Sequence, residues 1–166
     1  MEELLADKKF DIISTPDKDF IVAFDKAMND YCYDCGGVIG SGKSVCPYII
    51  TYKKTGVKNS PFVAQIFIGN KSILLQFQFK NRMDFNTKMY KHREYIENAP
   101  EHIKNVFVSE RTNECRYCKE ICGKYLYTID GHLYEKCGAA FDFVQPSLKK
   151  LPDYIELLSK FYSKKS

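Results

Sequence analysis

The most regular hydrophobic pattern in the chain lies between residues 72 and 80. Apolar and polar residues alternate there, which is the period-two pattern of a β-strand with one buried face. A turn at Gly69-Asn70-Lys71 precedes it, and two further apolar runs, 48–54 and 62–68, come before that turn. The three runs together predict an antiparallel meander. Its buried face should include Ile73, Leu75, Phe77 and Phe79.

Two amphipathic helices are predicted on either side of this meander in the sequence. The first begins at Thr15-Pro16-Asp17, which offer a capping hydroxyl, a proline at the first helical position and a carboxylate near the positive end of the helix dipole. We expect it to end at Gly36-Gly37, because glycine readily adopts the left-handed conformation that closes helices. The last begins at Pro152-Asp153. Their inward faces should contain Phe20, Ile21, Phe24, Met28 and Tyr31 in the first helix, and Leu151, Tyr154, Ile155, Leu158 and Phe161 in the last.

The segment between residues 84 and 107 predicts two more helices. Asp84 is a suitable cap for one, and Ala99-Pro100-Glu101 begins a shorter one that reaches Phe107. Residues 139–144 predict a further strand. We expect His102 at the surface, whereas His92 lies on the apolar side of the first of these helices, together with Phe85, Met89 and Ile96.

Four cysteines between residues 110 and 138 indicate a metal site. Cys115 and Cys118 have the two-residue spacer that is the commonest half of a structural zinc site. The turn pair Asp130-Gly131 between two aromatic-rich runs predicts a β-hairpin, which should bring Cys137 back beside Cys122. We therefore predict a closed, structural zinc site with four thiolate ligands. They are Cys115, Cys118, Cys122 and Cys137.

Other interpretations of these four cysteines stay open. Thiolate ligands also hold iron–sulfur clusters, and four reduced cysteines can pack as small hydrophobic residues without any metal. A disulfide pair is disfavoured, because the chain has an odd total of seven cysteines and its first residues are charged rather than signal-like. His132 is an alternative ligand, but its place directly after the turn predicts an exposed hairpin tip.

Residues 37–44 match the phosphate-binding loop pattern G-x-x-x-x-G-K-[ST], which makes Gly37, Gly42, Lys43 and Ser44 candidate nucleotide-binding residues. Such a loop works only between a buried strand and a helix whose N-terminal amides face the phosphates. Here a predicted helix precedes the match, and Pro47 and a strand follow it. We therefore expect a glycine-rich connection from helix to sheet.

A second cysteine motif, Cys32 and Cys35, has the spacing of a redox pair. Its position near a predicted helix C-terminus opposes thiolate formation, and Asp34 adds an unfavourable charge. Together with Cys46 these cysteines would form half of a metal site, but no fourth ligand is evident. We expect them to be ordinary thiols.

The 166 residues suit one α+β domain: an antiparallel sheet, a meander plus a further strand, packed by helices, with residues 110–138 as a zinc-clipped hairpin insertion. Twelve Tyr and twelve Phe suit strands and also a pocket for a flat ligand. A net charge of +4 is too small to indicate a polyanionic partner. Because no run is long enough for a membrane span, we expect a soluble, cytoplasmic protein.

Residues 91–101, residues 127–131 with 135–137, and residues 151–155 carry a resemblance to a group of small soluble proteins, chiefly from Firmicutes, with a four-cysteine metal-binding insertion. The resemblance covers most of the chain. It implies a bacterial context and no particular chemistry.

These patterns favour a binding module for a small molecule or a protein, with zinc in a structural role. Nucleic acid is the alternative partner, through the basic stretch 80–93, where Tyr90 is available for stacking. An enzyme that uses the phosphate-loop match ranks third, since we find no catalytic arrangement of nucleophile and base. The basic residues of the stretch 80–93 are Lys80, Arg82, Lys88, Lys91 and Arg93.

Overall fold

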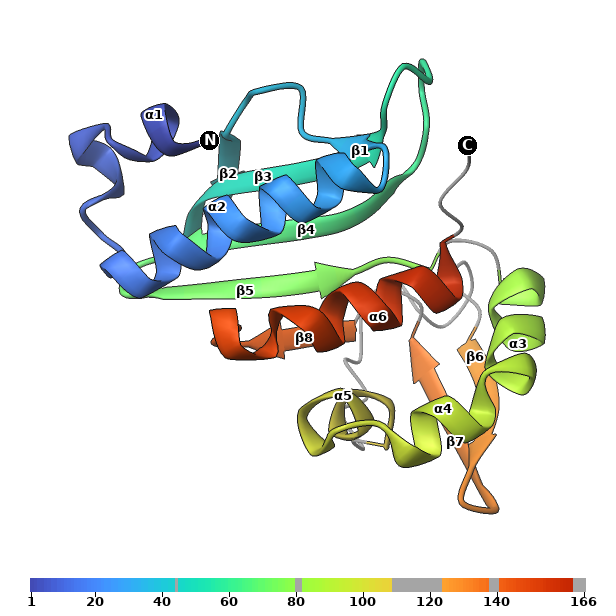
Figure 1. The fold of residues 1–166 in the computed structure, drawn as a ribbon. Helices are drawn as coiled ribbons and strands as arrows, with labels where there is room; N and C mark the ends of the chain where they lie inside the picture. Colours follow the sequence, from blue (N-terminus) through green and yellow to red (C-terminus); the bar gives the residue numbers. More distant parts are fainter. Residues whose placement is uncertain (44, 80–81, 109–123, 138–140, 163–166) are drawn as a thin grey trace.

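The computed structural model describes residues 1–43, 45–79, 82–108, 124–137 and 141–162 (Figure 1). Within them the protein has an α+β fold. The helices are α1 (Glu2–Leu5), α2 (Thr15–Asp30), α3 (Arg82–Lys91), α4 (Arg93–Asn98), α5 (Glu101–Val108) and α6 (Leu151–Phe161). The strands are β1 (Tyr33–Asp34), β2 (Gly40–Lys43), β3 (Cys46–Lys54), β4 (Phe62–Gly69), β5 (Ser72–Phe77), β6 (Lys124–Ile129), β7 (His132–Cys137) and β8 (Phe141–Val144).

The main sheet is antiparallel and has the order β1-β3-β4-β5-β8, with β2 also paired to β3. The predicted meander is β3-β4-β5, and the predicted further strand is β8, at the edge beside β5. Ile73, Leu75 and Phe77 are buried, as their alternation with polar residues predicts. Both predictions are therefore confirmed.

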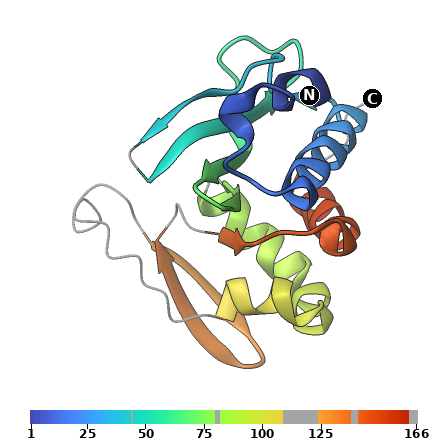
Figure 2. The same ribbon diagram turned by 90° about the vertical axis from the view of Figure 1, so that its left-hand side faces the viewer.

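Helices α2 and α6 lie on the same face of this sheet, which both views show (Figures 1 and 2). The core between the layers is aromatic. The ring centroid of Phe24 on α2 lies 5.3 Å from that of Tyr52 on β3, and Tyr154 on α6 lies 4.9 Å from Phe143 on β8. Edge-on and tilted contacts of this kind add to the burial of apolar area, which is the main stabilising term of the fold.

The opposite face of the sheet carries a polar row. Thr51, Gln65, Gln76 and Asp142 are register partners across β3, β4, β5 and β8. Gln65 Nε2 donates a hydrogen bond of 3.0 Å to Thr51 Oγ1, and Gln76 Nε2 donates one of 2.8 Å to Asp142 Oδ1. These cross-strand pairs hold the strands in register on the face that α2 and α6 leave uncovered.

Helix α2 begins at Thr15, one residue before the predicted start, and its cap is Ser14 rather than the predicted Thr15. Ser14 and Asp17 form a capping box, in which each side chain accepts a hydrogen bond from the backbone of the other residue. The predicted end at Gly36-Gly37 is wrong, because α2 ends at Asp30. Cys32 then adopts a left-handed φ of 61°, and the chain turns into β1, which pairs with β3.

The predicted hairpin is present as β6 and β7. Asp130 and Gly131 have φ angles of 48° and 77°, and two such positive values are typical of the tight turn that joins adjacent antiparallel strands. The hairpin packs against the helices on one side. Tyr127 Oη donates a buried hydrogen bond of 2.6 Å to the carbonyl oxygen of Phe107 at the end of α5, and Ile129 is fully buried.

The long helix predicted after Asp84 is divided into α3 and α4 at His92, whose φ and ψ of −110° and 17° are not helical. Phe85, Met89 and Ile96 are buried as predicted. His92 is half-buried, and its ring centroid lies 6.3 Å from that of Phe161. Among the described residues, no helix is both long and apolar enough to cross a membrane.

Candidate ligand pocket and cysteine sites

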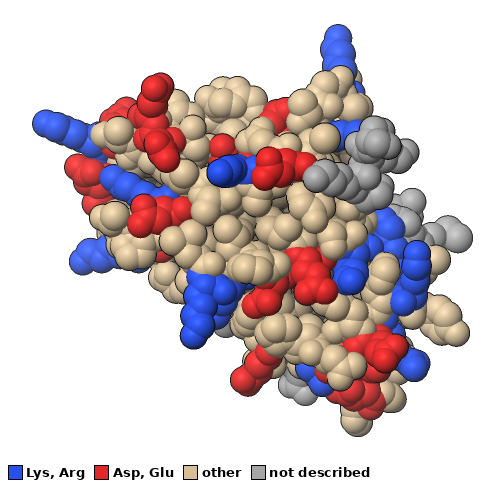
Figure 3. Space-filling model, viewed as in Figure 1, with Lys and Arg blue, Asp and Glu red and all other residues tan. Residues whose placement is uncertain are grey.

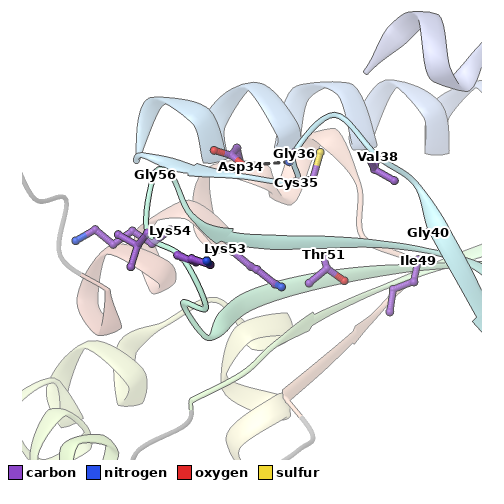
Figure 4. Close-up of a pocket in the computed structure, with 12 residues that line it drawn as sticks. Asp34, Cys35, Gly36, Val38, Gly40, Ile49, Thr51, Lys53, Lys54 and Gly56 are labelled. Atoms are coloured by element: carbon purple, nitrogen blue, oxygen red, sulfur yellow. Dashed lines mark hydrogen bonds between the residues drawn. The ribbon is translucent and has the colours of Figure 1, made fainter.

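A change of register along one edge of the sheet creates a pocket. Asp34 of β1 pairs with Lys53 of β3, and Gly40 of β2 pairs with Ile49 of the same strand. Residues 35–39 therefore stand opposite residues 50–52, so the outer segment is two residues longer than the stretch of β3 that it faces. The extra length cannot be paired, and the segment arches away from β3 (Figure 4).

The space under this arch is an open pocket of about 610 Å³, which we call the edge pocket. Gly36 and Val38 lie on the arch, Asp34 lies on β1 where the arch begins, and Thr51 and Lys53 lie on β3 below it (Figure 4). Residues 56–58, from the loop between β3 and β4, complete the lining. This volume falls within the range of small-molecule sites in proteins.

Positive charge dominates the lining of the edge pocket. Lys53, Lys54 and Lys58 line it, whereas Asp34 is the sole carboxylate of the lining. Asp34 Oδ1 already accepts a hydrogen bond of 3.0 Å from the backbone nitrogen of Gly36. No ion pair of the three lysines is found within the described part of the chain. The pocket therefore offers cations without a protein counter-ion.

Cys35 belongs to the arch, but its thiol is turned toward α2. Its Sγ lies 3.5 Å from Asp25 Oδ1, to which it donates a hydrogen bond. Burial raises the pKa of the Cys35 thiol, and the Asp25 carboxylate raises it further. The sequence predicts an unfavourable setting for a thiolate, and this direction is confirmed, with Asp25 rather than Asp34 as the neighbouring charge.

The buried hydroxyl of Tyr52 lies behind the same arch. Tyr52 is fully buried, and among the described residues its oxygen meets no group with the geometry of a hydrogen bond. Burial raises the pKa of Tyr52 well above its usual value, and the Asp25 carboxylate and the Cys35 sulfur raise it further. Asp25, Cys35 and Tyr52 thus form one polar cluster between α2 and β3.

The three cysteines outside the predicted zinc set are not one site. Cys32 and Cys35 flank β1, at the end of β3 that contains Lys53 and Lys54, while Cys46 begins β3. Lys54 lies eight positions after Cys46 along the extended strand, which corresponds to about 26 Å. All three thiols are free. The described residues contain no group of three or more potential metal-binding side chains.

The phosphate-loop match lies at a β-hairpin rather than before a helix. Gly40–Lys43 is strand β2, and Lys43 pairs with Cys46 of β3. A side chain at Gly42 would place its Cβ 2.0 Å from the carbonyl oxygen of Cys46, so glycine is required here by the close approach of two strands. The expected glycine-rich connection is thus a turn and loop at residues 37–39 and an edge strand from Gly40 to Lys43, and Ser44 lies outside the described residues.

The predicted zinc ligands fall largely beyond the described part of the chain. Cys115, Cys118 and Cys122 lie outside the described residues, and only the backbone of Cys137 is described. Cys137 ends β7, where it pairs with Lys124, the first residue of β6. Cys137 is therefore paired with a residue that lies two positions after Cys122 in the sequence. The zinc prediction requires such a pairing. The zinc and iron–sulfur interpretations both stay predictions.

Two basic residues of the stretch 80–93, Lys88 and Arg93, make contacts within the protein. Lys88 Nζ donates to the carbonyl oxygen of Phe161 and lies 5.8 Å from the centre of the Tyr162 ring. Arg93 Nε lies 3.3 Å from Glu97 Oε1. The side chains of Lys80 and Arg82 lie outside the described residues. The surface view also shows both signs of charge interspersed over the face that carries α2 and α6 (Figure 3).

His102 is a titratable group that the sequence analysis placed at the surface, and its environment is more enclosed than predicted. Its side chain is 22% exposed, and its Nε2 lies 3.1 Å from Asp153 Oδ2 on α6. Burial lowers the pKa of His102, Asp153 opposes that shift, and Lys150 adds to it. The spacing of the two residues in the sequence gives no signal of this contact.

Comparisons with known proteins add no functional information. No protein-family model matches the chain, and no curated protein or solved structure matches it.

Proposed function

We propose that this chain is a small zinc-binding protein that serves as a binding module, with a small molecule held in the edge pocket and zinc in a structural role. The edge pocket is the observation that carries the binding function. It combines a suitable volume with apolar walls at Val38 and Val57 and polar groups at Thr51 and Lys53. A few polar groups on an apolar surface are typical of sites that bind small molecules.

The proposed zinc ion holds the base of the β6–β7 hairpin. Support for it comes from the C-x2-C spacing of Cys115 and Cys118 and from the register that pairs Cys137 with Lys124. Four thiolates leave no open coordination position for a substrate, so the zinc has no direct part in chemistry. Its contribution is to fix the base of the hairpin.

A thermal-shift screen of the full chain against a metabolite library tests the ligand-binding function. Ligands that bind the folded state should raise the melting temperature by an amount that grows with the logarithm of their concentration relative to Kd. Val38→Trp, which fills the pocket at a position that is 60% exposed, should abolish these shifts, whereas Val45→Trp at the distant β2–β3 turn should preserve them. A library in which no compound raises the melting temperature contradicts the proposal.

Nucleic acid is a second candidate partner, because Tyr90 is 84% exposed beside the exposed Lys91 on α3. An exposed aromatic ring next to a cation provides stacking and charge for a single strand. Retention on an RNA or DNA column that falls steeply with salt, and that is lost in Tyr90→Ala, would place this function above small-molecule binding.

A further inference from the structure

We infer that the ligand of the edge pocket is a small molecule with at least two negative charges, such as a polyphosphate or a polycarboxylate. This inference rests on the proposed ligand-binding function and specifies its chemical class. It is drawn from the lining of the pocket, which includes three lysines and a single carboxylate residue, Asp34.

The first step is the arrangement of the lysines. Lys53 and Lys54 are consecutive, and consecutive residues of a regular strand point to opposite faces. The register of β3 with β4 shifts between Tyr52 and Lys53, which is the irregularity expected of a β-bulge. The extra residue is Val63 on β4, and a bulge increases the local twist of the strands. Both lysines line the same pocket. Lys58 joins them from the following loop.

The second step is the absence of competition for these cations. Within the described residues, none of the three lysines forms an ion pair, and Asp34 is engaged with the backbone of Gly36. Two positive charges therefore remain after the Asp34 carboxylate is counted. An anion with two charges balances this lining, whereas a neutral ligand would leave the ammonium groups hydrated and would gain nothing from their charge.

The third step concerns the other hydrogen-bonding group on the pocket floor. Thr51 Oγ1 accepts a hydrogen bond from Gln65 Nε2, so its own hydroxyl proton is directed elsewhere. This hydroxyl lines the pocket and is free to donate to an oxygen of the ligand. The pocket thus offers donors in excess of acceptors, which suits phosphate or carboxylate oxygens.

The pocket size limits the ligand to a small molecule. Its volume of about 610 Å³ is closed on one side by the arch and on another by residues 56–58. The apolar side chains of Val38, Ile49 and Val57 line part of it. These walls would contact a carbon skeleton that carries the charges, so an organic anion should bind more tightly than inorganic phosphate.

Isothermal titration of the full chain with pyrophosphate, citrate and glucose tests the inference. We expect at least one of the two anions to bind and glucose to show no binding. Lys53→Gln and Lys58→Gln should each weaken anion binding by about tenfold to hundredfold, the effect of losing one charge-assisted hydrogen bond. Lys53→Arg should retain most of the affinity, and Lys26→Gln, an exposed lysine on α2, should not change it.

The outcomes separate this inference from the proposed function. Preference for pyrophosphate indicates a phosphate ligand and preference for citrate a carboxylate ligand, and both support the inference. If neither anion binds while the thermal-shift screen yields a neutral ligand that Val38→Trp excludes, the inference is wrong and the ligand-binding function stands. Equal weakening by Lys26→Gln and Lys53→Gln also overturns it, because that result shows binding without a specific site.

Discussion

Lys104 Nζ lies 2.6 Å from Asp130 Oδ2, and this ion pair joins helix α5 to the tip of the β6–β7 hairpin. Glu97 of α4 adds a second contact, because its Oε1 accepts a hydrogen bond of 3.1 Å from the backbone nitrogen of Asp130. The hairpin is thus fastened at its tip by polar contacts and along its inner face by Tyr127 and Ile129. The proposed zinc ion would fasten the remaining part, its base.

The hairpin contacts should differ in strength according to their burial. Tyr127→Phe removes a buried hydrogen bond and leaves the Phe107 carbonyl without its partner, so we expect a loss of about 1–3 kcal/mol in the free energy of unfolding. Lys104→Met should cost less than about 1 kcal/mol, because Asp130 is half exposed. Urea denaturation measures both, with the exposed Tyr90→Phe as the control. An equal effect of Tyr127→Phe and Tyr90→Phe would contradict this description.

Gly42 and Gly40 provide a matched test of the phosphate-loop segment. Gly42→Ala places a Cβ 2.0 Å from the Cys46 carbonyl oxygen, so the two strands must separate, with an expected cost of about 1–3 kcal/mol. Gly40→Ala meets Ile49 at an ordinary 3.6 Å and should change stability little. Urea denaturation compares them. ATP binding that Lys43→Ala abolishes would instead support a nucleotide site.

The pKa of Cys35 predicts an order of thiol reactivity. Because burial and Asp25 raise that pKa, a smaller fraction of Cys35 is thiolate at a given pH, and alkylation by iodoacetamide should be slow. Cys32 is exposed and should react first. Asp25→Asn should lower the pKa of Cys35 and accelerate its labelling, which peptide mass spectrometry can follow. Labelling of Cys35 as fast as that of Cys32 in the wild-type chain would refute the prediction.

The histidines predict a loss of stability in mild acid. The pKa of His92 and that of His102 are lowered in the folded protein, so the unfolded chain binds more protons below the usual histidine value of about 6.5. Stability should therefore be retained above that pH and decrease as the pH falls through the folded-state values. Denaturation at pH 7.5 and pH 5.5 measures the change, which His92→Gln with His102→Gln should reduce.

The contact between His102 and Asp153 predicts how neighbouring charges change the pKa of His102. Asp153 favours the charged imidazole and Lys150 disfavours it. NMR titration should therefore show the pKa of His102 shifted down in Asp153→Asn and up in Lys150→Gln. Shifts in the opposite directions would mean that the two helices are packed differently.

The parts of the fold with strong periodicity could be predicted from the sequence. The alternation from Ser72 to Phe77 defines β5, and the Pro16 and Pro152 signals define the starts of α2 and α6. The buried apolar residues of these elements recur at the fixed period of a strand or a helix. The local sequence is therefore enough to predict them.

The candidate site could not be predicted in the same way. Strands β1 and β2 are two and four residues long, and β2 consists of glycine, serine and lysine, so neither has a hydrophobic period. The edge pocket arises because both strands pair with β3 in different registers, which is a long-range property of the fold. The four predicted zinc ligands are inferred from the spacing of the cysteines alone, and zinc binding stays a prediction.

Metal content of freshly purified, reduced protein, measured by inductively coupled plasma mass spectrometry, tests the zinc site most directly. We expect one zinc ion per chain, loss of that zinc in Cys118→Ser and Cys137→Ser, and its retention in Cys46→Ser. Iron in place of zinc would indicate the iron–sulfur alternative. A wild-type protein without any bound transition metal would contradict the four-thiolate site.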